Sequence, residues 1–187
     1  MDYINDREKI VELLKNNLSE EKFYHSLETE KRAVILAEIH GEDTLKAGFA
    51  GLIHDITKCM DNRALAEKYN IGIGASEKTL HQLTGAEYIK ENGITDDEEI
   101  INAVRTHTTG GKDMTRLQKI IYLADATEPM RNFYSVDKLR ELSENDLDEA
   151  MLMSLGNTIS MLKKRNLPID ENTSLAYNEI SKAVKNK

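Results

Sequence analysis

The segment GLIHDITK, residues 51–58, places His54 and Asp55 side by side within an aliphatic run. A buried carboxylate destabilises a fold unless a cation or hydrogen-bond donors compensate it. Successive residues of a helix point about 100° apart, so both side chains could reach an ion lying over that turn. Taken alone, the pair is equally compatible with a structural role, in which the carboxylate orients the imidazole.

Two further residues stand where the face of a helix should be buried. Asp125 directly follows the mostly aliphatic run IIYLA, so it is expected to be a second buried acid that needs a partner. His107 comes three residues after Val104 on an apolar stripe, where a lone histidine is more often a core residue than a ligand. For His107 both interpretations stay open.

The remaining histidines carry less information one by one. His25 and His81 lie near the starts of two helical segments, and each could instead be a surface or capping residue. His40 precedes Gly41, a pattern typical of a helix C-terminus, where a cationic side chain favours the helix dipole and the glycine can cap. We therefore expect a structural role for His40.

Size and charge limit the classes of function open to the chain. Its 187 residues, 40% of them hydrophobic, suffice for one sizeable core, so we expect a single domain over residues 1–187. A net charge of −8 argues against a broad surface for nucleic acid or an anionic membrane. Cys59 is the single cysteine, and no signal-type or membrane-spanning apolar run occurs. We expect a cytoplasmic protein.

The elements that position these residues are predicted to be helices. Only two prolines occur, and apolar residues recur at steps of three and four, which is typical of an all-α protein. Four apolar stripes are found: Leu45, Phe49, Leu52, Ile53 and Ile56; Ile100, Ile101 and Val104; Leu117, Ile120, Ile121 and Ala124; and a longer one from Leu147 to Leu162. Thr95 is expected to cap the helix that carries the second stripe, and Ser143 or Asn145 is expected to cap the helix that carries the fourth. Pro129 should end the third, and residues 69–76 should form a loop.

The candidate residues follow the order of the ligands in HD-domain metal-dependent phosphohydrolases: His25, His54, Asp55, His81, His107 and Asp125. The segments YHSL, GLIHDITK, RTHTTG and IIYLADATEPMR resemble those of the YqeK-type branch, whose members hydrolyse diadenosine tetraphosphate symmetrically. The resemblance covers about residues 22–155 and implies an HD-domain helical bundle on which the C-terminal helices pack. Gln82-Leu83-Thr84 stands where the branch has a small, glycine-containing sequence.

The resemblance also implies how metal would be held. His25, His54, Asp55 and Asp125 would bind one transition-metal ion, whereas His81 and His107 would bind a second, with Asp55 between the two. Imidazole and carboxylate ligands suit iron first, in divalent or mixed-valence form, with manganese or cobalt as alternatives. A hydroxide held by both ions would attack phosphorus, so that His54 and Asp55 would be catalytic as well as ligating.

Polar residues near these ligands are candidates for binding phosphate. Lys58 could meet a phosphate or be solvated near a helix end. Thr108, Thr109 and Gly110 could offer hydroxyls and an unhindered backbone N–H, or could form an ordinary loop. Arg131 could make a bidentate phosphate contact or a surface salt bridge. The resemblance favours the phosphate contacts.

The function implied by the resemblance is hydrolysis of diadenosine tetraphosphate to two ADP. One alternative is another HD nucleotide phosphohydrolase, either a nucleotidase or a cyclic nucleotide phosphodiesterase. Others are a metal-dependent nucleotide sensor without useful turnover and a helical interaction module with scattered histidines. The expected partner is the nucleotide, with no nucleic acid and no membrane. A homodimer through the C-terminal helix and the contacts to adenine stay open.

Overall fold

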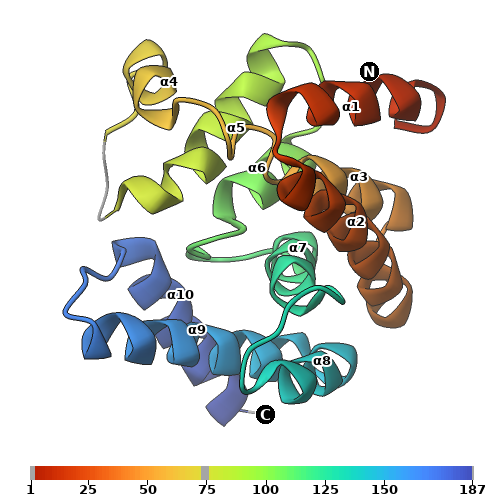
Figure 1. Ribbon diagram of the computed structural model, residues 1–187. Coiled ribbons are helices and arrows are strands. Elements are labelled where there is room, and N and C mark those ends of the chain that lie inside the picture. The colour runs from red at the N-terminus through yellow and green to blue at the C-terminus, as the bar shows by residue number, and fades with distance from the viewer. Residues whose placement is uncertain (1–2, 73–75, 187) are drawn as a thin grey trace.

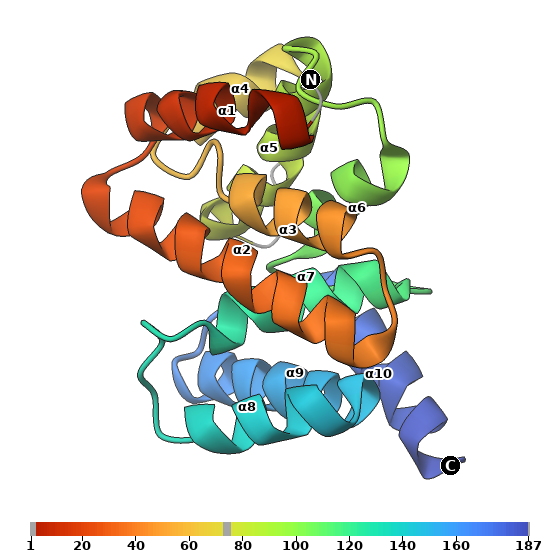
Figure 2. The same ribbon diagram turned by 90° about the vertical axis from the view of Figure 1, so that its right-hand side faces the viewer.

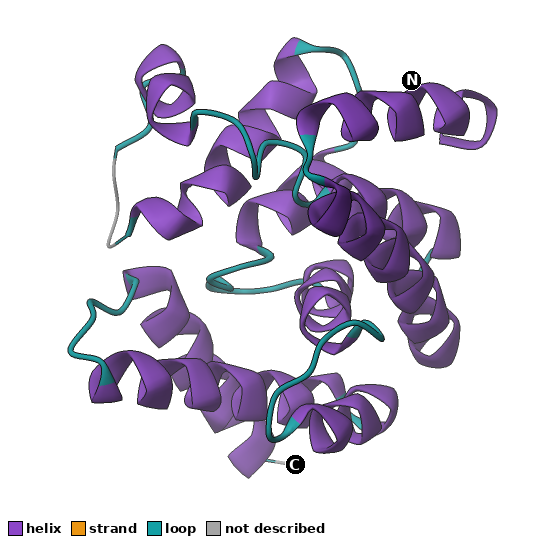
Figure 3. Ribbon diagram, viewed as in Figure 1, coloured by secondary structure: helices purple, strands orange, loops and turns teal. Residues whose placement is uncertain are grey.

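The computed structural model describes residues 3–72 and 76–186, and all regular structure in these ranges is helical, as predicted (Figure 3). The elements are α1 (Tyr3–Asn17), α2 (Glu20–His40), α3 (Thr44–Ile53), α4 (Asn62–Lys68), the short 3-10 helix η1 (Glu77–Thr79), α5 (Leu80–Glu91), α6 (Glu98–Thr106), α7 (Arg116–Thr127), α8 (Val136–Asn145), α9 (Leu147–Lys164) and α10 (Glu171–Lys185).

Helix α7 lies between two groups of helices (Figures 1 and 2). It packs against α2, α3 and α6 on one side and against α8 and α9 on the other. Helix α10 packs on α9, and α4 packs on α5. Because α7 touches both groups, a residue near the end of α7 can contact residues of helices that are far apart in the sequence.

A continuous apolar core joins the helices. Ile10 and Leu14 of α1, Ile121 of α7 and Ile180 of α10 belong to the same buried cluster. Burying each such side chain contributes roughly 1.5–3 kcal/mol, and helices this short need that packing to be stable. A single domain requires a shared core of this kind. The division of the chain into one domain stays a prediction.

Two helix ends agree with the sequence prediction. Helix α2 ends at His40, and Gly41 caps it with a left-handed φ of 65°. The His40 ring donates from Nε2 to the carbonyl of Ser143 at 2.7 Å, so it joins α2 to α8. Helix α7 ends at Thr127, directly before Glu128 and Pro129, because proline cannot continue a helix.

Two predicted caps are wrong by one to three residues. Helix α6 is capped by Asp97 rather than Thr95, because the Asp97 carboxylate accepts a hydrogen bond from the N–H of Glu99. Helix α9 is capped by Asp146, which accepts from the first N–H groups of that helix. Ser143 and Asn145, the predicted caps, belong instead to α8, a helix that the apolar stripes did not indicate.

Helix α3 ends at Ile53, before the predicted stripe reaches Ile56. Beyond it the backbone tightens into hydrogen bonds between residues three apart, from Ile56 N–H to Ile53 at 3.1 Å and from Lys58 N–H to Asp55 at 2.7 Å. His54 and Asp55 therefore lie in a tight turn directly after the helix, not within it.

The predicted loop at residues 69–76 is non-helical at its described ends, residues 69–72 and 76. Residues 73–75 lie outside the described residues. Within the described ranges, no helix combines the length and apolar character that crossing a bilayer requires.

Candidate metal centre

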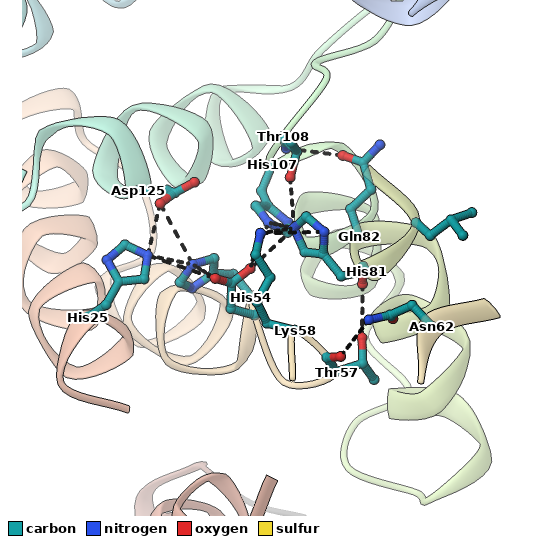
Figure 4. A network of polar contacts seen from close by, with 12 residues as sticks. His25, His54, Thr57, Lys58, Asn62, His81, Gln82, His107, Thr108 and Asp125 are labelled. Atoms are coloured by element: carbon teal, nitrogen blue, oxygen red, sulfur yellow. Dashed lines mark hydrogen bonds and ion pairs between the residues drawn. The ribbon is translucent and has the colours of Figure 1, made fainter. Parts of the chain in front are cut away.

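The fold brings together all six residues that the sequence singled out as metal ligands. Figure 4 shows the four histidines and Asp125 directed toward one another. The six residues come from α2, the turn after α3, the start of α5, the end of α6 and the end of α7: His25, His54, Asp55, His81, His107 and Asp125. Each of the four histidines is at most 4% exposed, and Asp55 is 3% exposed. Asp125 is less buried, so it lies at the open edge of the cluster.

His54 and His107 are positioned by the same local device. Each follows the last residue of a helix, and its Nδ1 lies 2.7 Å from the carbonyl oxygen three residues back, that of Gly51 and Val104 respectively. A carbonyl only accepts, so Nδ1 carries the proton in both rings. When each ring is neutral, its Nε2 is a free lone pair directed into the cluster.

His25 is held by a buried carboxylate. Its Nδ1 lies 3.1 Å from Oε1 of Glu128, which is 1% exposed. In the tautomer that donates from Nδ1 to Glu128, its Nε2 also offers a lone pair, 2.9 Å from Oδ1 of Asp125 and 3.2 Å from Nε2 of His54. Lone pairs that face one another at this distance repel unless a cation lies between them. This chemistry of the donor set fits a metal ion.

The two oxygens of Asp55 face different pairs of histidines. Oδ2 lies 4.0 Å from Nε2 of His25 and 3.7 Å from Nε2 of His54. Oδ1 lies 3.2 Å from Nε2 of His81 and 3.3 Å from Nε2 of His107. Although buried, Oδ1 has no hydrogen bond of acceptable geometry within the described part of the chain. A carboxylate so placed is suited to lie between two cations.

Burial and mutual contacts set the protonation of these groups. Complete burial lowers the pKa of His54 to about 3, even though Asp55 and Asp125 oppose the shift, so this imidazole is neutral. Burial would raise the pKa of Asp55, but the imidazoles of His54, His107 and His81 outweigh it and hold that pKa well below its usual range. Neutral imidazoles and ionised carboxylates are the states that bind metal.

Three sets of ligand atoms lie close enough to share an ion, each within 4.8 Å: His25, His54 and Asp55; His54, His107 and Asp125; and Asp55, His81 and His107. The first and third sets meet at Asp55. The cluster can therefore hold metal on either side of this carboxylate.

Two of the predicted phosphate-binding side chains reach the His81 half of the cluster directly. The Lys58 ammonium lies 2.8 Å from Nε2 of His81 and 3.5 Å from Oδ1 of Asp55. The hydroxyl of Thr108 lies 3.0 Å from the same His81 nitrogen. Both side chains thus border the half of the cluster that contains His81.

The backbone N–H groups of the 108–110 turn are already used. Those of Thr108 and Thr109 donate to Oε1 of Gln82 at 3.0 and 3.1 Å, and that of Gly110 donates to the carbonyl of Thr106 at 2.9 Å. The Thr108 hydroxyl is therefore the group of this turn that faces the candidate ligands.

Gln82 is a residue whose role the sequence did not reveal. It is 2% exposed, and its Nε2 donates to the Thr109 hydroxyl at 2.9 Å in addition to the two bonds at Oε1. Because Gln82 follows His81 and Thr108 follows His107, this amide ties together the backbones that carry two candidate ligands. One signal in the sequence could have indicated this role: Gln82-Leu83-Thr84 replaces the small, glycine-containing sequence that the branch usually has after His81.

Glu128 and Arg131 lie on the side of the cluster that contains His25. Glu128 was not singled out by the sequence, although its place between a helix end and Pro129 fixes it in an extended conformation beneath His25. Arg131 forms an ion pair with Asp125 and lies 3.3 Å from Nε2 of His25. Its guanidinium is thus part of the site rather than of a surface salt bridge.

Comparison with known proteins agrees with this geometry. The family model described as HD domain matches residues 23–130, a range that contains all six clustered residues. Two proteins called symmetrical bis(5'-nucleosyl)-tetraphosphatase are each 35% identical to the chain: that of Halalkalibacterium halodurans over 181 residues, 94% of this chain and 97% of its own, and that of Bacillus subtilis over 184 residues, 92% and 96%.

A solved structure from Clostridium acetobutylicum, described as a predicted HD superfamily hydrolase involved in NAD metabolism, is 38% identical. It superposes with a TM-score of 0.88 and covers 97% of this chain and 98% of its own. The similarity therefore extends beyond the range of the family model to the C-terminal helices.

Proposed function

Since the chain belongs to the HD domain family, we propose that it is a symmetrical bis(5'-nucleosyl)-tetraphosphatase, which hydrolyses diadenosine tetraphosphate to two ADP. The similarity to relatives of that name runs over nearly the whole chain, C-terminal helices included. The observation that carries the mechanism is the placement of Asp55, whose two oxygens face separate pairs of imidazole nitrogens.

In this proposal the cluster holds two transition-metal ions. One is bound by His25, His54, Asp55 and Asp125, and the other by Asp55, His81 and His107. The ligand set suits iron first, with manganese or cobalt as alternatives. When bound, such a pair supplies a water activated at neutral pH and polarises the phosphoryl oxygen that is attacked.

The residues of the chain orient the reacting groups. Lys58, Thr108 and Arg131 contact the phosphates, because Lys58 and Thr108 border the cluster at His81 and Arg131 borders it at Asp125. Thr109 and Gly110 support the turn that presents Thr108, since their N–H groups are engaged within the protein. His54 and Asp55 are the catalytic ligands, and the burial of both excludes bulk water from the centre.

The partner of the chain is this nucleotide, and a role in the cytoplasm follows from the substrate and from the single cysteine, Cys59. The net charge of −8 means that the negative phosphates need the cations and metal of the site for binding. Neither nucleic acid nor membrane is part of the proposed function.

Product analysis tests this function. Protein supplied with iron or manganese is incubated with diadenosine tetraphosphate, nucleoside monophosphates and cyclic nucleotides, and the products are separated by chromatography. We expect ADP alone from the first substrate and little turnover of the others. Cleavage of monophosphates or cyclic nucleotides instead would assign the chain to another HD phosphohydrolase activity, and tight binding without turnover would make it a sensor.

A further inference from the structure

We propose that two adjoining cavities beside the metal centre are separate subsites for the two nucleosides of one substrate molecule. The inference rests on the proposed function and deepens it by locating the two ends of the substrate. The cavities are contiguous, because Thr108, Thr158 and Met161 line both of them. Thr108 also touches His81, so the shared wall begins at the candidate ligands.

The near cavity has a volume of about 500 Å³ and reaches the candidate metal centre, because two of the candidate ligands, His107 and Asp125, line it. Its lining combines Arg131 and these two ligands with the apolar side chains of Phe133 and Met161. Phe133 is 41% exposed, so its ring is accessible for stacking on a base. A nucleotide in this cavity would place its phosphates at the ligands and its base on Phe133.

The far cavity, of about 220 Å³, lies between the start of α5 and the turn that joins α9 to α10. Its lining combines apolar side chains, among them Leu162, Leu167 and Pro168, with the cations Lys78 and Arg165 and one acid, Asp170, whose carboxylate accepts from the N–H of Asn172. Neither cation has an ion-pair partner in the part of the chain that the structure describes. In a protein with a net charge of −8, unpaired cations around an apolar hollow suit an anionic ligand with an aromatic group.

The symmetry of the substrate explains why two cavities are needed. Diadenosine tetraphosphate has identical ends, and symmetrical cleavage breaks the chain at its middle, so both nucleosides extend away from the reacting phosphorus. With one nucleoside in the near cavity, the other half must leave along the Thr108 wall. That wall leads into the far cavity, where Arg165 and Lys78 would meet the remaining phosphates and the apolar side chains the second adenine.

Matched substitutions on the surface test this assignment. Arg165→Ala and Leu167→Glu alter the far cavity, with Lys164→Ala and Leu175→Glu as controls that make the same chemical change on exposed residues outside both cavities. Phe133→Ala alters the near cavity, and Tyr134→Ala, in the same loop and fully exposed, is its control. For each variant, kcat/KM for diadenosine tetraphosphate and the inhibition constant of ADP are measured.

We expect Arg165→Ala and Leu167→Glu to lower kcat/KM for diadenosine tetraphosphate about tenfold, which corresponds to the loss of roughly 1.4 kcal/mol. The inhibition constant of ADP should change less than about twofold, because ADP alone takes the near cavity. Phe133→Ala should lower kcat/KM and raise the inhibition constant of ADP. The three control variants should resemble the wild type in both.

Other results would overturn the inference in distinguishable ways. If the wild type cleaves the substrate but the far-cavity variants behave like their controls, the second subsite is wrong and the proposed function stands. If Arg165→Ala weakens ADP as much as the dinucleotide, the assignment of the two cavities is wrong. If the wild type shows no cleavage with any metal, the proposed function fails, and the inference fails with it.

Discussion

The two halves of the candidate metal centre are built differently. On the side of His25 and His54, both Nδ1 atoms have acceptors inside the protein, Glu128 and the carbonyl of Gly51. On the other side, His107 has such an acceptor, but His81 does not: in the described part of the chain its contacts are with the side chains of Lys58, Thr108, Asp55 and His107.

This difference indicates different degrees of preorganisation. A ligand whose second ring nitrogen is fixed by a buried acceptor keeps its orientation without metal, whereas His81 depends on contacts with other polar side chains and on the backbone clamp at Gln82. We therefore expect the His25 side to bind its ion more tightly. The His81 side borders the proposed phosphate contacts, where adjustment during binding and release would be useful.

Asp55 should give the largest effect because it belongs to both halves. Asp55→Ala removes the carboxylate between the histidine pairs and leaves each set one ligand short. We expect loss of both ions and a decrease in kcat of at least about a thousandfold, since metal ions contribute several kcal/mol to such a transition state. Elemental analysis and steady-state kinetics check this. Retention of two ions by this variant would show that Asp55 does not join the halves.

Substituting one histidine in each half should show how tightly each half binds its own metal ion. His81→Ala is expected to reduce the metal content from about two ions per chain to about one, because the His25 side keeps all of its ligands. His25→Ala should weaken the ion on the tighter side, whereas the other ion keeps Asp55, His81 and His107. Titration against a chelating dye measures each affinity, and equal losses in the two variants would remove the distinction between the halves.

Glu128 tests whether the acceptor beneath His25 is the source of the tighter binding. Glu128→Ala leaves the Nδ1 proton of His25 without its acceptor, and we expect a 10–100-fold loss of affinity for the ion on that side. Glu128→Gln retains an acceptor oxygen and should recover part of the loss. An unchanged affinity in Glu128→Ala would mean that the ligand geometry is set elsewhere.

Gln82 tests the clamp on the weaker side. Gln82→Met keeps the side-chain volume but leaves the N–H groups of Thr108 and Thr109 without their acceptor, so we expect a loss of about 1–3 kcal/mol in unfolding free energy. The ion on the His81 side should weaken, and the KM for the dinucleotide should rise more than kcat falls. Gln118→Met, which removes the cap contact of α7 and the hydrogen bonds of Gln118 to Asn102 and Thr106 but none at Thr108 or Thr109, is the control for these kinetic effects.

The smallest effect is expected at the one histidine outside the cluster. His40→Ala removes a hydrogen bond to the carbonyl of Ser143 and should lower the unfolding free energy by about 0.5–1.5 kcal/mol. Metal content and kcat should stay at the wild-type level. Urea unfolding and kinetics check both, and a large fall in kcat would mean that this residue had been assigned wrongly.

The sequence indicated which residues could meet, but not everything that orients them. Asp55 and Asp125 were conspicuous because acids in apolar runs need partners, and the helical periodicity identified the fold class. The choice between Thr95 and Asp97 as a cap depends on single hydrogen bonds of similar strength, so local patterns could not decide it. Gln82 and Glu128 act across 27 and 103 residues of sequence, distances at which periodicity carries no information.

The central claim is that one carboxylate joins two metal ions in a single hydrolytic centre. Titration of metal-free protein with Mn²⁺, followed at each step by electron paramagnetic resonance and by hydrolysis of diadenosine tetraphosphate, tests it most directly. We expect a spectrum of two coupled ions to develop toward two equivalents per chain, with ADP formation rising alongside it. Full activity at one equivalent, or two ions that show no coupling, would contradict the claim.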